Sequence, residues 1–93
     1  MAIKVNYFAQ IKQVVGGIDS ETIQLETPCS VKQLVNKLVE NHGDSLQNVL
    51  LNSSGNLRST ILLVIGDTQI PWNSSVEIQE GDEISLLSPL AGG

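Results

Sequence analysis

The feature that most constrains the fold is one amphipathic segment, residues 30–43, with the sequence SVKQLVNKLVENHG. Ser30 can accept a hydrogen bond from the first-turn amides of a helix, and Gln33 can reach back to complete a capping box. Gly43 is the residue type that commonly ends a helix. Apolar residues recur between them at helical spacing, at Val31, Leu34, Val35, Leu38 and Val39. Such a helix must bury its apolar stripe against another layer.

Segments with strand periodicity on both sides of this helix predict that the other layer is a sheet. Apolar and polar residues alternate before the helix, and a β-branched and apolar run, STILLVI, follows it. The expected strands cover residues 3–8, 20–27, 59–65, 68–70 and 84–87. The first two form a hairpin with a long connection. Strands from the two ends of the chain can pair in the centre of the sheet, because a right-handed crossover through the helix permits parallel neighbours.

The length of 93 residues allows one domain with one modest core. The predicted fold class is α+β, with a mixed sheet of about five strands over one main helix. Residues 9–17 are expected to form a short helical or irregular turn, and residues 45–51 a short second helix. The folded domain is expected to span residues 1–87, followed by a flexible C-terminal tail at 88–93.

The charge distribution limits the kind of partner. The formal net charge is −5, and every Lys and Arg lies before residue 59. Nucleic acid is an unfavourable partner for such a chain, because binding depends on basic side chains that neutralise phosphates. A basic surface on another protein fits the acidic C-terminal third better, although an acidic surface also simply favours solubility. The longest apolar run is ILLVI, far shorter than the roughly 20 residues that cross a membrane, and we expect a cytoplasmic protein.

The side chains that commonly carry catalysis are scarce. Cys29 is the single cysteine and His42 the single histidine, so one chain cannot build a multi-cysteine or multi-histidine metal site. Cys29 precedes a helix N-terminus, which favours a thiolate, but no base for a nucleophile is evident and a structural thiol is the simpler interpretation. His42 suits the C-terminal end of the helix. Asp82 and Glu83 would point to opposite faces of a strand, so they form no acid-base pair. The sequence predicts a protein that is not an enzyme by itself.

The C-terminal residues SPLAGG are the remaining candidate for chemistry. Gly92 and Gly93 have no Cβ, so a narrow channel in another enzyme can admit their backbone, and the chain ends on a carboxylate with no side chain nearby. A carboxylate is inert in acyl transfer, but an ATP-using partner can activate it as an acyl-adenylate that sulfur or nitrogen attacks. The tail is therefore the predicted site.

The chain resembles the ubiquitin-like sulfur-carrier proteins of the MoaD/ThiS kind, which include the small subunit of molybdopterin synthase and the thiamine sulfur carrier. Three stretches carry the resemblance, and they span essentially the whole chain: VNYFAQIKQVVGG, CSVKQLVNKLVENHG and EGDEISLLSPLAGG. The diglycine tail is the most specific of them. The resemblance implies a β-grasp fold.

The resemblance also implies a mechanism. In the family, an activating enzyme of the ubiquitin type uses ATP and magnesium to adenylate the C-terminal carboxylate, which here is that of Gly93, and a sulfur donor then converts it to a thiocarboxylate. The carried sulfur serves cofactor biosynthesis, and a role like that of the molybdopterin synthase small subunit, with a large subunit as partner, is favoured. The residues implied to thread into the partner are Leu87, Ser88, Pro89, Leu90, Ala91 and Gly92.

Two other functions stay open at this point. The same tail suits a ubiquitin-like modifier joined to target lysines through Gly93, and the domain could also be a β-grasp binding module without chemistry. Candidate apolar anchors for a partner are Leu86, Leu87, Leu90 and Trp72, although strand alternation buries one of the two leucines at 86 and 87. Candidate acidic contacts are Glu80, Asp82 and Glu83.

Overall fold

The structure is a computed structural model that describes residues 1–26 and 28–88. The described part of the chain forms strands and helices in the following order: β1 Ala2–Tyr7, α1 Ala9–Val14, β2 Ser20–Gln24, β3 Cys29–Ser30, α2 Val31–His42, α3 Asp44–Leu50, β4 Leu62–Ile65, β5 Thr68–Gln69, β6 Glu77–Ile78 and β7 Glu83–Leu87.

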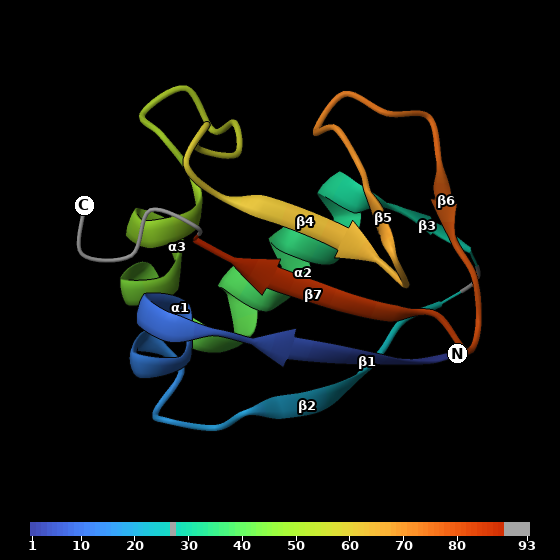
Figure 1. The fold of residues 1–93 in the computed structure, drawn as a ribbon, viewed down its shortest axis with the longest axis horizontal. Helices are drawn as coiled ribbons and strands as arrows, with labels where there is room; N and C mark the ends of the chain where they lie inside the picture. Colours follow the sequence, from blue (N-terminus) through green and yellow to red (C-terminus); the bar gives the residue numbers. More distant parts are fainter. Residues whose placement is uncertain (27, 89–93) are drawn as a thin grey trace.

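Five of the strands form one mixed sheet in the order β2-β1-β7-β4-β5 (Figure 1). The first and last strands lie side by side in its centre and run parallel, with Tyr7 opposite Leu86. The other pairs are antiparallel, and Leu62 of β4 lies opposite Leu87 of β7. This arrangement confirms the predicted α+β sheet and the central parallel pair.

Helix α2 forms for the local reasons that its sequence indicates. The Ser30 hydroxyl accepts a hydrogen bond from the Gln33 amide at 3.1 Å, and the Gln33 side chain accepts one from the Ser30 amide at 2.8 Å. The helix ends at Gly43, whose φ of 82° is costly for residues with a Cβ. Both predicted helix signals are confirmed.

The hydrophobic core lies between the helices and one face of the sheet, and α2 lies behind the strands in the view of Figure 1. From the helices, Ile11, Leu34, Leu38, Leu46 and Leu50 are fully buried, and from the strands so are Ile3, Val5, Ile78, Ile84 and Leu86. No buried polar or charged residue is found within the described ranges. Among the described residues the core is aliphatic apart from Tyr7 and Cys29, in keeping with the few aromatic residues of the sequence.

Several element boundaries differ from the predicted ones. The first strand covers Ala2–Tyr7 instead of 3–8. The run predicted as a strand from residue 59 becomes one only at Leu62, because the Ile61 amide closes a turn on the Arg58 carbonyl at 3.0 Å. The two-residue strands β3 and β6 were not predicted. The short helices expected within 9–17 and 45–51 are α1 and α3. The division into a domain and a tail stays a prediction.

Candidate functional site

The last strand, β7, holds the chain where it leads toward the predicted tail. It lies between β1 and β4, so hydrogen-bonded ladders fix it on both sides. Of the predicted tail contacts, Leu87 is the last residue of β7 and Ser88 follows it, and both are half-buried. Pro89, Leu90, Ala91, Gly92 and Gly93 lie outside the described residues. The fold therefore delivers the chain beyond Ser88 from the centre of a rigid sheet.

Strand alternation separates the two leucines that were candidate anchors. Leu86 is 0% exposed and faces the helices, so the prediction that it anchors a partner is wrong. Leu87 faces the opposite side of the sheet and is half-buried. Trp72 is half-buried too, and its Nε1 donates to the Asn56 side-chain oxygen at 3.1 Å while the Lys32 ammonium lies 5.6 Å from its ring centroid. The indole thus joins two loops and the start of α2.

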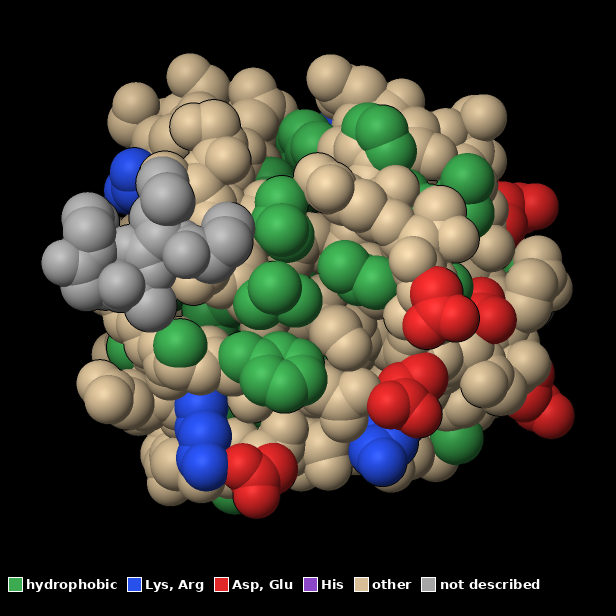
Figure 2. All heavy atoms as spheres, in the orientation of Figure 1, with side chains coloured by type: hydrophobic (Ala, Val, Ile, Leu, Met, Phe, Trp, Pro, Cys, Tyr) green, Lys and Arg blue, Asp and Glu red, His purple; other side chains and the backbone are tan. Residues whose placement is uncertain are grey.

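Apolar side chains gather on the outer face of the sheet around Leu87. Leu62 lies directly opposite Leu87, and Val64 faces the same side two residues further along β4. Phe8 follows β1 in extended conformation, is 48% exposed, and donates its amide to the Leu86 carbonyl at 3.3 Å. We call these four residues, Phe8, Leu62, Val64 and Leu87, the exit surface. Figure 2 shows hydrophobic side chains clustered in the middle of this face of the molecule.

A strained residue helps to place Phe8 on the exit surface. Ala9 has a φ of 52°, which costs a residue with a Cβ about 1 kcal/mol. Helix α1 begins at this residue and buries Ile11 in the core, while Phe8 stays outside. The junction thus leaves the Phe8 side chain exposed beside the end of β7.

The acidic candidates lie at the other end of β7. Glu83 is the first residue of the strand and accepts a hydrogen bond from the Asn6 side chain at 2.7 Å, and Asp82 accepts one from the Gln79 amide at 2.8 Å. The five residues of β7 separate this end from Leu87 by roughly 13 Å of strand rise. Acidic side chains are visible on the right of Figure 2, away from most of the hydrophobic cluster. A partner that contacts both the acidic residues and Leu87 must extend along the whole length of β7.

Cys29 and His42, the other two residues considered for chemistry, have structural roles. Cys29 is buried, and burial raises the pKa of its thiol, so the thiolate that the helix N-terminus was expected to favour is not supported. His42 is the last residue of α2, as expected, and its Nε2 contacts the Glu21 carboxylate, which also accepts a hydrogen bond from the Tyr7 hydroxyl. Burial, followed by the hydrogen bond and the charge of Glu21, raises the pKa of Tyr7. This polar cluster joins α2 to β1 and β2.

Two kinds of site are not found in the described part of the chain. Within residues 1–26 and 28–88, no group of three or more His, Cys, Asp or Glu side chains is placed to hold a metal ion. No helix among these residues has the length and apolar character needed to cross a bilayer.

Sequence reasoning missed three of the four residues of the exit surface. A signal for Leu62 and Val64 was present, because the apolar run in β4 supplies both faces of a strand while one main helix can cover only one of them. Phe8 gave a weaker signal, since it comes directly after the alternation of Ile3, Val5 and Tyr7.

The sequence is similar to proteins of one known family. A family model described as the ThiS family matches residues 5–93. A curated molybdopterin synthase sulfur carrier subunit from Chlamydomonas reinhardtii is 25% identical over 93 residues, which cover 100% of both chains. A ubiquitin-related modifier 1 from Ajellomyces capsulatus is 35% identical over 68 residues, which cover 71% of this chain and 56% of that protein.

Solved structures show the same fold. SAMP1 from Haloferax volcanii superimposes with a TM-score of 0.86 at 20% identity and covers 100% of both chains. A subunit in the complex of subunits 1 and 2 of molybdopterin-converting factor from Helicobacter pylori superimposes with a TM-score of 0.63 at 24% identity, also over 100% of both chains. These likenesses confirm the β-grasp architecture.

Proposed function

The chain belongs to the ThiS family, and from this premise we propose that it is a sulfur carrier whose Gly93 carboxylate is adenylated and then converted to a thiocarboxylate. Membership places it among ubiquitin-like sulfur carriers and modifiers. The proposed recipient of the sulfur is a cofactor-forming pathway, with a role like that of the molybdopterin synthase small subunit. The relative from Chlamydomonas, which matches over its full length, supports this choice.

The proposed chemistry uses the chain as substrate of a partner enzyme. A carboxylate oxygen of Gly93 attacks the α-phosphorus of ATP, which the partner holds with magnesium, and pyrophosphate leaves. Sulfide supplied by a donor then attacks the acyl carbon and displaces AMP, so a C–S bond replaces the C–O bond to AMP and, after loss of the sulfur proton, a thiocarboxylate remains. The chain itself supplies the acyl group, and the backbone that precedes it is narrow because Gly92 and Gly93 have no side chains.

One observation carries the proposal most directly. The central strand of the sheet ends within an apolar surface, and the sequence that follows Ser88 finishes in two glycines. Apolar side chains that are half-buried or exposed, such as Leu87 and Phe8, are the type that anchors protein interfaces. We propose that the exit surface docks the activating enzyme, and a synthase large subunit afterwards, while the tail enters the partner's active site.

A reconstitution experiment tests the carrier chemistry. Incubation with the cognate activating enzyme, ATP, magnesium and a sulfur donor is expected to raise the intact mass by about 16 Da, because sulfur replaces one oxygen. Deletion of Gly93 is expected to abolish the gain. An unchanged mass, with the enzyme shown to be active on another carrier, would contradict the proposal.

A pair of variants tests the docking surface within the same assay. Leu62→Asp places a charge on the exit surface, whereas Asn41→Asp adds the same charge at an exposed position of α2. We expect the first to raise the KM for the carrier at least tenfold and the second to leave it unchanged. Equal KM values for the two variants would show that the exit surface is not the docking site.

The second candidate function is a protein modifier joined to lysines through Gly93, and the identity of 35% to a ubiquitin-related modifier favours keeping it. An acyl-adenylate or thioester can pass its acyl group to an amine as well as to sulfur. Cell extracts that contain a tagged chain would then show conjugates of higher mass that disappear on deletion of Gly93. Their absence across growth conditions would leave the carrier function alone.

A further inference from the structure

Strand β2 forms an edge of the sheet, because none of the described strands pairs with its second side. Met1 and Leu25 exchange two backbone hydrogen bonds at 2.5 and 2.8 Å at the start of the ladder with β1. Bonded pairs alternate along an antiparallel ladder, so Ile23 turns its amide and carbonyl toward β1. Thr22 and Gln24 therefore direct their backbone donors and acceptors away from β1, to the open side.

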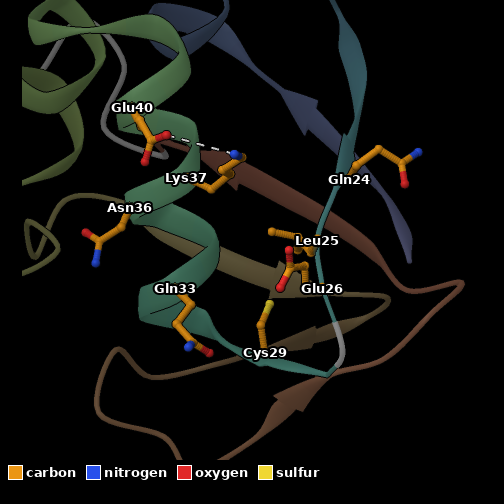
Figure 3. A pocket seen from close by; sticks show the side chains of 8 residues that line it. All are labelled: Gln24, Leu25, Glu26, Cys29, Gln33, Asn36, Lys37 and Glu40. Atoms are coloured by element: carbon orange, nitrogen blue, oxygen red, sulfur yellow. Dashed lines mark ion pairs between the residues drawn. The ribbon is translucent and has the colours of Figure 1, made fainter.

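A hollow of about 630 Å³ lies beside the end of this edge. It is bounded on one side by Gln24, Leu25 and Glu26 and on the other by α2, and Figure 3 shows Lys37 of α2 pointing across it toward the segment of Leu25 and Glu26, while Gln24 points away. Helix α2 continues along β2, since His42 reaches Glu21 further up the strand. The open edge of β2 adjoins the hollow at Gln24, and we call this edge together with the hollow the groove.

The lining of the groove combines an apolar floor with an acidic rim. Leu25 and Cys29 lie at the floor, and Cys29 carries no charge there because burial raises the pKa of its thiol. Glu26 and Glu40 are exposed on the rim. Lys37 is the one basic residue among the described lining residues, and its ammonium group lies 3.9 Å from the Glu40 carboxylate. Two carboxylates against one ammonium group leave the rim negative.

We propose that this groove binds an extended segment of a partner protein, which adds a strand to the edge of β2 and places a basic side chain between Glu26 and Glu40. Backbone hydrogen bonds to Thr22 and Gln24 would supply affinity, and the acidic rim would select the side chain. An apolar residue of the same segment covers Leu25. This surface goes beyond the proposed function, which uses the exit surface.

The charge of the molecule favours a basic partner over a second copy of this chain. Two copies paired through β2 would bring two acidic rims together on chains that each carry a formal charge of −5. The groove also lies apart from the exit surface. Gln24 pairs with Ala2 at the start of β1, whereas Phe8 follows the end of β1. Both surfaces can therefore be occupied at once.

Amide chemical shifts in the full chain test the proposal with a six-residue peptide of alternating valine and arginine, acetylated and amidated. Changes are expected at residues 20–26 and 33–40. Glu26→Gln and Glu40→Gln are each expected to raise the Kd about two- to fivefold, the range of a partly exposed ion pair. Asp67→Asn removes the same charge at an exposed position outside the groove and is the matched control. Changes centred on the exit surface, or no changes at millimolar peptide, would overturn the proposal.

A proline at the edge separates strand addition from simple charge attraction. Thr22→Pro removes an amide that points away from β1, a position where an edge strand tolerates proline, and it is expected to raise the Kd at least tenfold. Thr22→Val keeps the amide and is expected to bind as the parent does. Should the proline variant fail to fold, a peptide N-methylated at alternate residues gives the same comparison. Equal binding of blocked and unblocked forms would refute strand addition, and self-association without peptide would assign the edge to a second copy instead.

Discussion

Leu62 and Leu63 are consecutive leucines of β4 that face opposite sides of the sheet. Leu63 is 1% exposed and packs in the core beneath the helices, whereas Leu62 is half-buried on the exit surface. The same residue type therefore stabilises the fold on one face and remains accessible to a partner on the other. The difference arises from topology, because the described helices cover one face only.

The largest expected effect is a loss of stability from a substitution on the face of the sheet that the helices cover. Leu63→Ala removes a fully packed side chain from the core, and the lost burial and the cavity should lower the free energy of unfolding by about 2 to 5 kcal/mol. Urea unfolding followed by circular dichroism measures the change. A loss below about 1 kcal/mol would mean that the core around β4 collapses readily.

The second effect concerns the polar group on the covered face. Because the folded state raises the pKa of Tyr7, the unfolded chain loses this proton near pH 10 while the folded chain keeps it. The stabilisation is thus complete below about pH 10 and should fall by about 1.4 kcal/mol per pH unit above it. Unfolding in urea at pH 9 and 11 measures this slope. Tyr7→Phe has no hydroxyl to titrate but keeps the lysines, so its free energy of unfolding should fall less between pH 9 and 11 than that of the parent. An equal fall in the two proteins would contradict the prediction.

The third effect tests the helix that covers this face. Ser30→Ala removes the acceptor for the Gln33 amide and should lower the free energy of unfolding by about 1 kcal/mol. Ser75→Ala, in an exposed loop, is the control and should change little. Thermal unfolding of the two variants gives the comparison, and equal melting temperatures would show that the capping box adds nothing to the folded state.

The smallest expected change in stability comes from the uncovered face. Leu62→Ala removes a side chain that is already partly in water, so unfolding should become easier by less than about 1 kcal/mol. Binding to the activating enzyme, measured by calorimetry, should nevertheless weaken about tenfold. A large loss of stability with intact binding would remove the distinction between the two faces.

The sequence predicted those parts of the fold that depend on local signals. The ends of α2 depend on residues close to them in sequence, namely Ser30 and Gln33 at its start and Gly43 at its end. The alternation of apolar and polar residues likewise indicates β1, β2 and β7. Strands β3 and β6 exist only because Cys29 and Ile78, 49 positions apart in the printed sequence, pair across the fold. A two-residue strand has no periodicity to detect.

The site was predictable to a similar extent. The role of the tail stays a prediction that rests on the order of residues, while the exit surface requires knowledge of which strands are neighbours. Phe8 and Leu62 lie far apart in sequence, and only the central position of β7 brings them to the same side. The contact of His42 with Glu21 likewise joins distant positions without a local pattern.

The central position of β7 has a mechanical consequence. A force applied at Ser88 acts on a strand that is held by hydrogen-bonded ladders on both sides. Since β1 runs parallel to β7, a pull between the first strand and the last loads their hydrogen bonds together, in shear, instead of opening them one at a time. The end of β7 at Leu87 therefore resists being peeled from the sheet one hydrogen bond at a time.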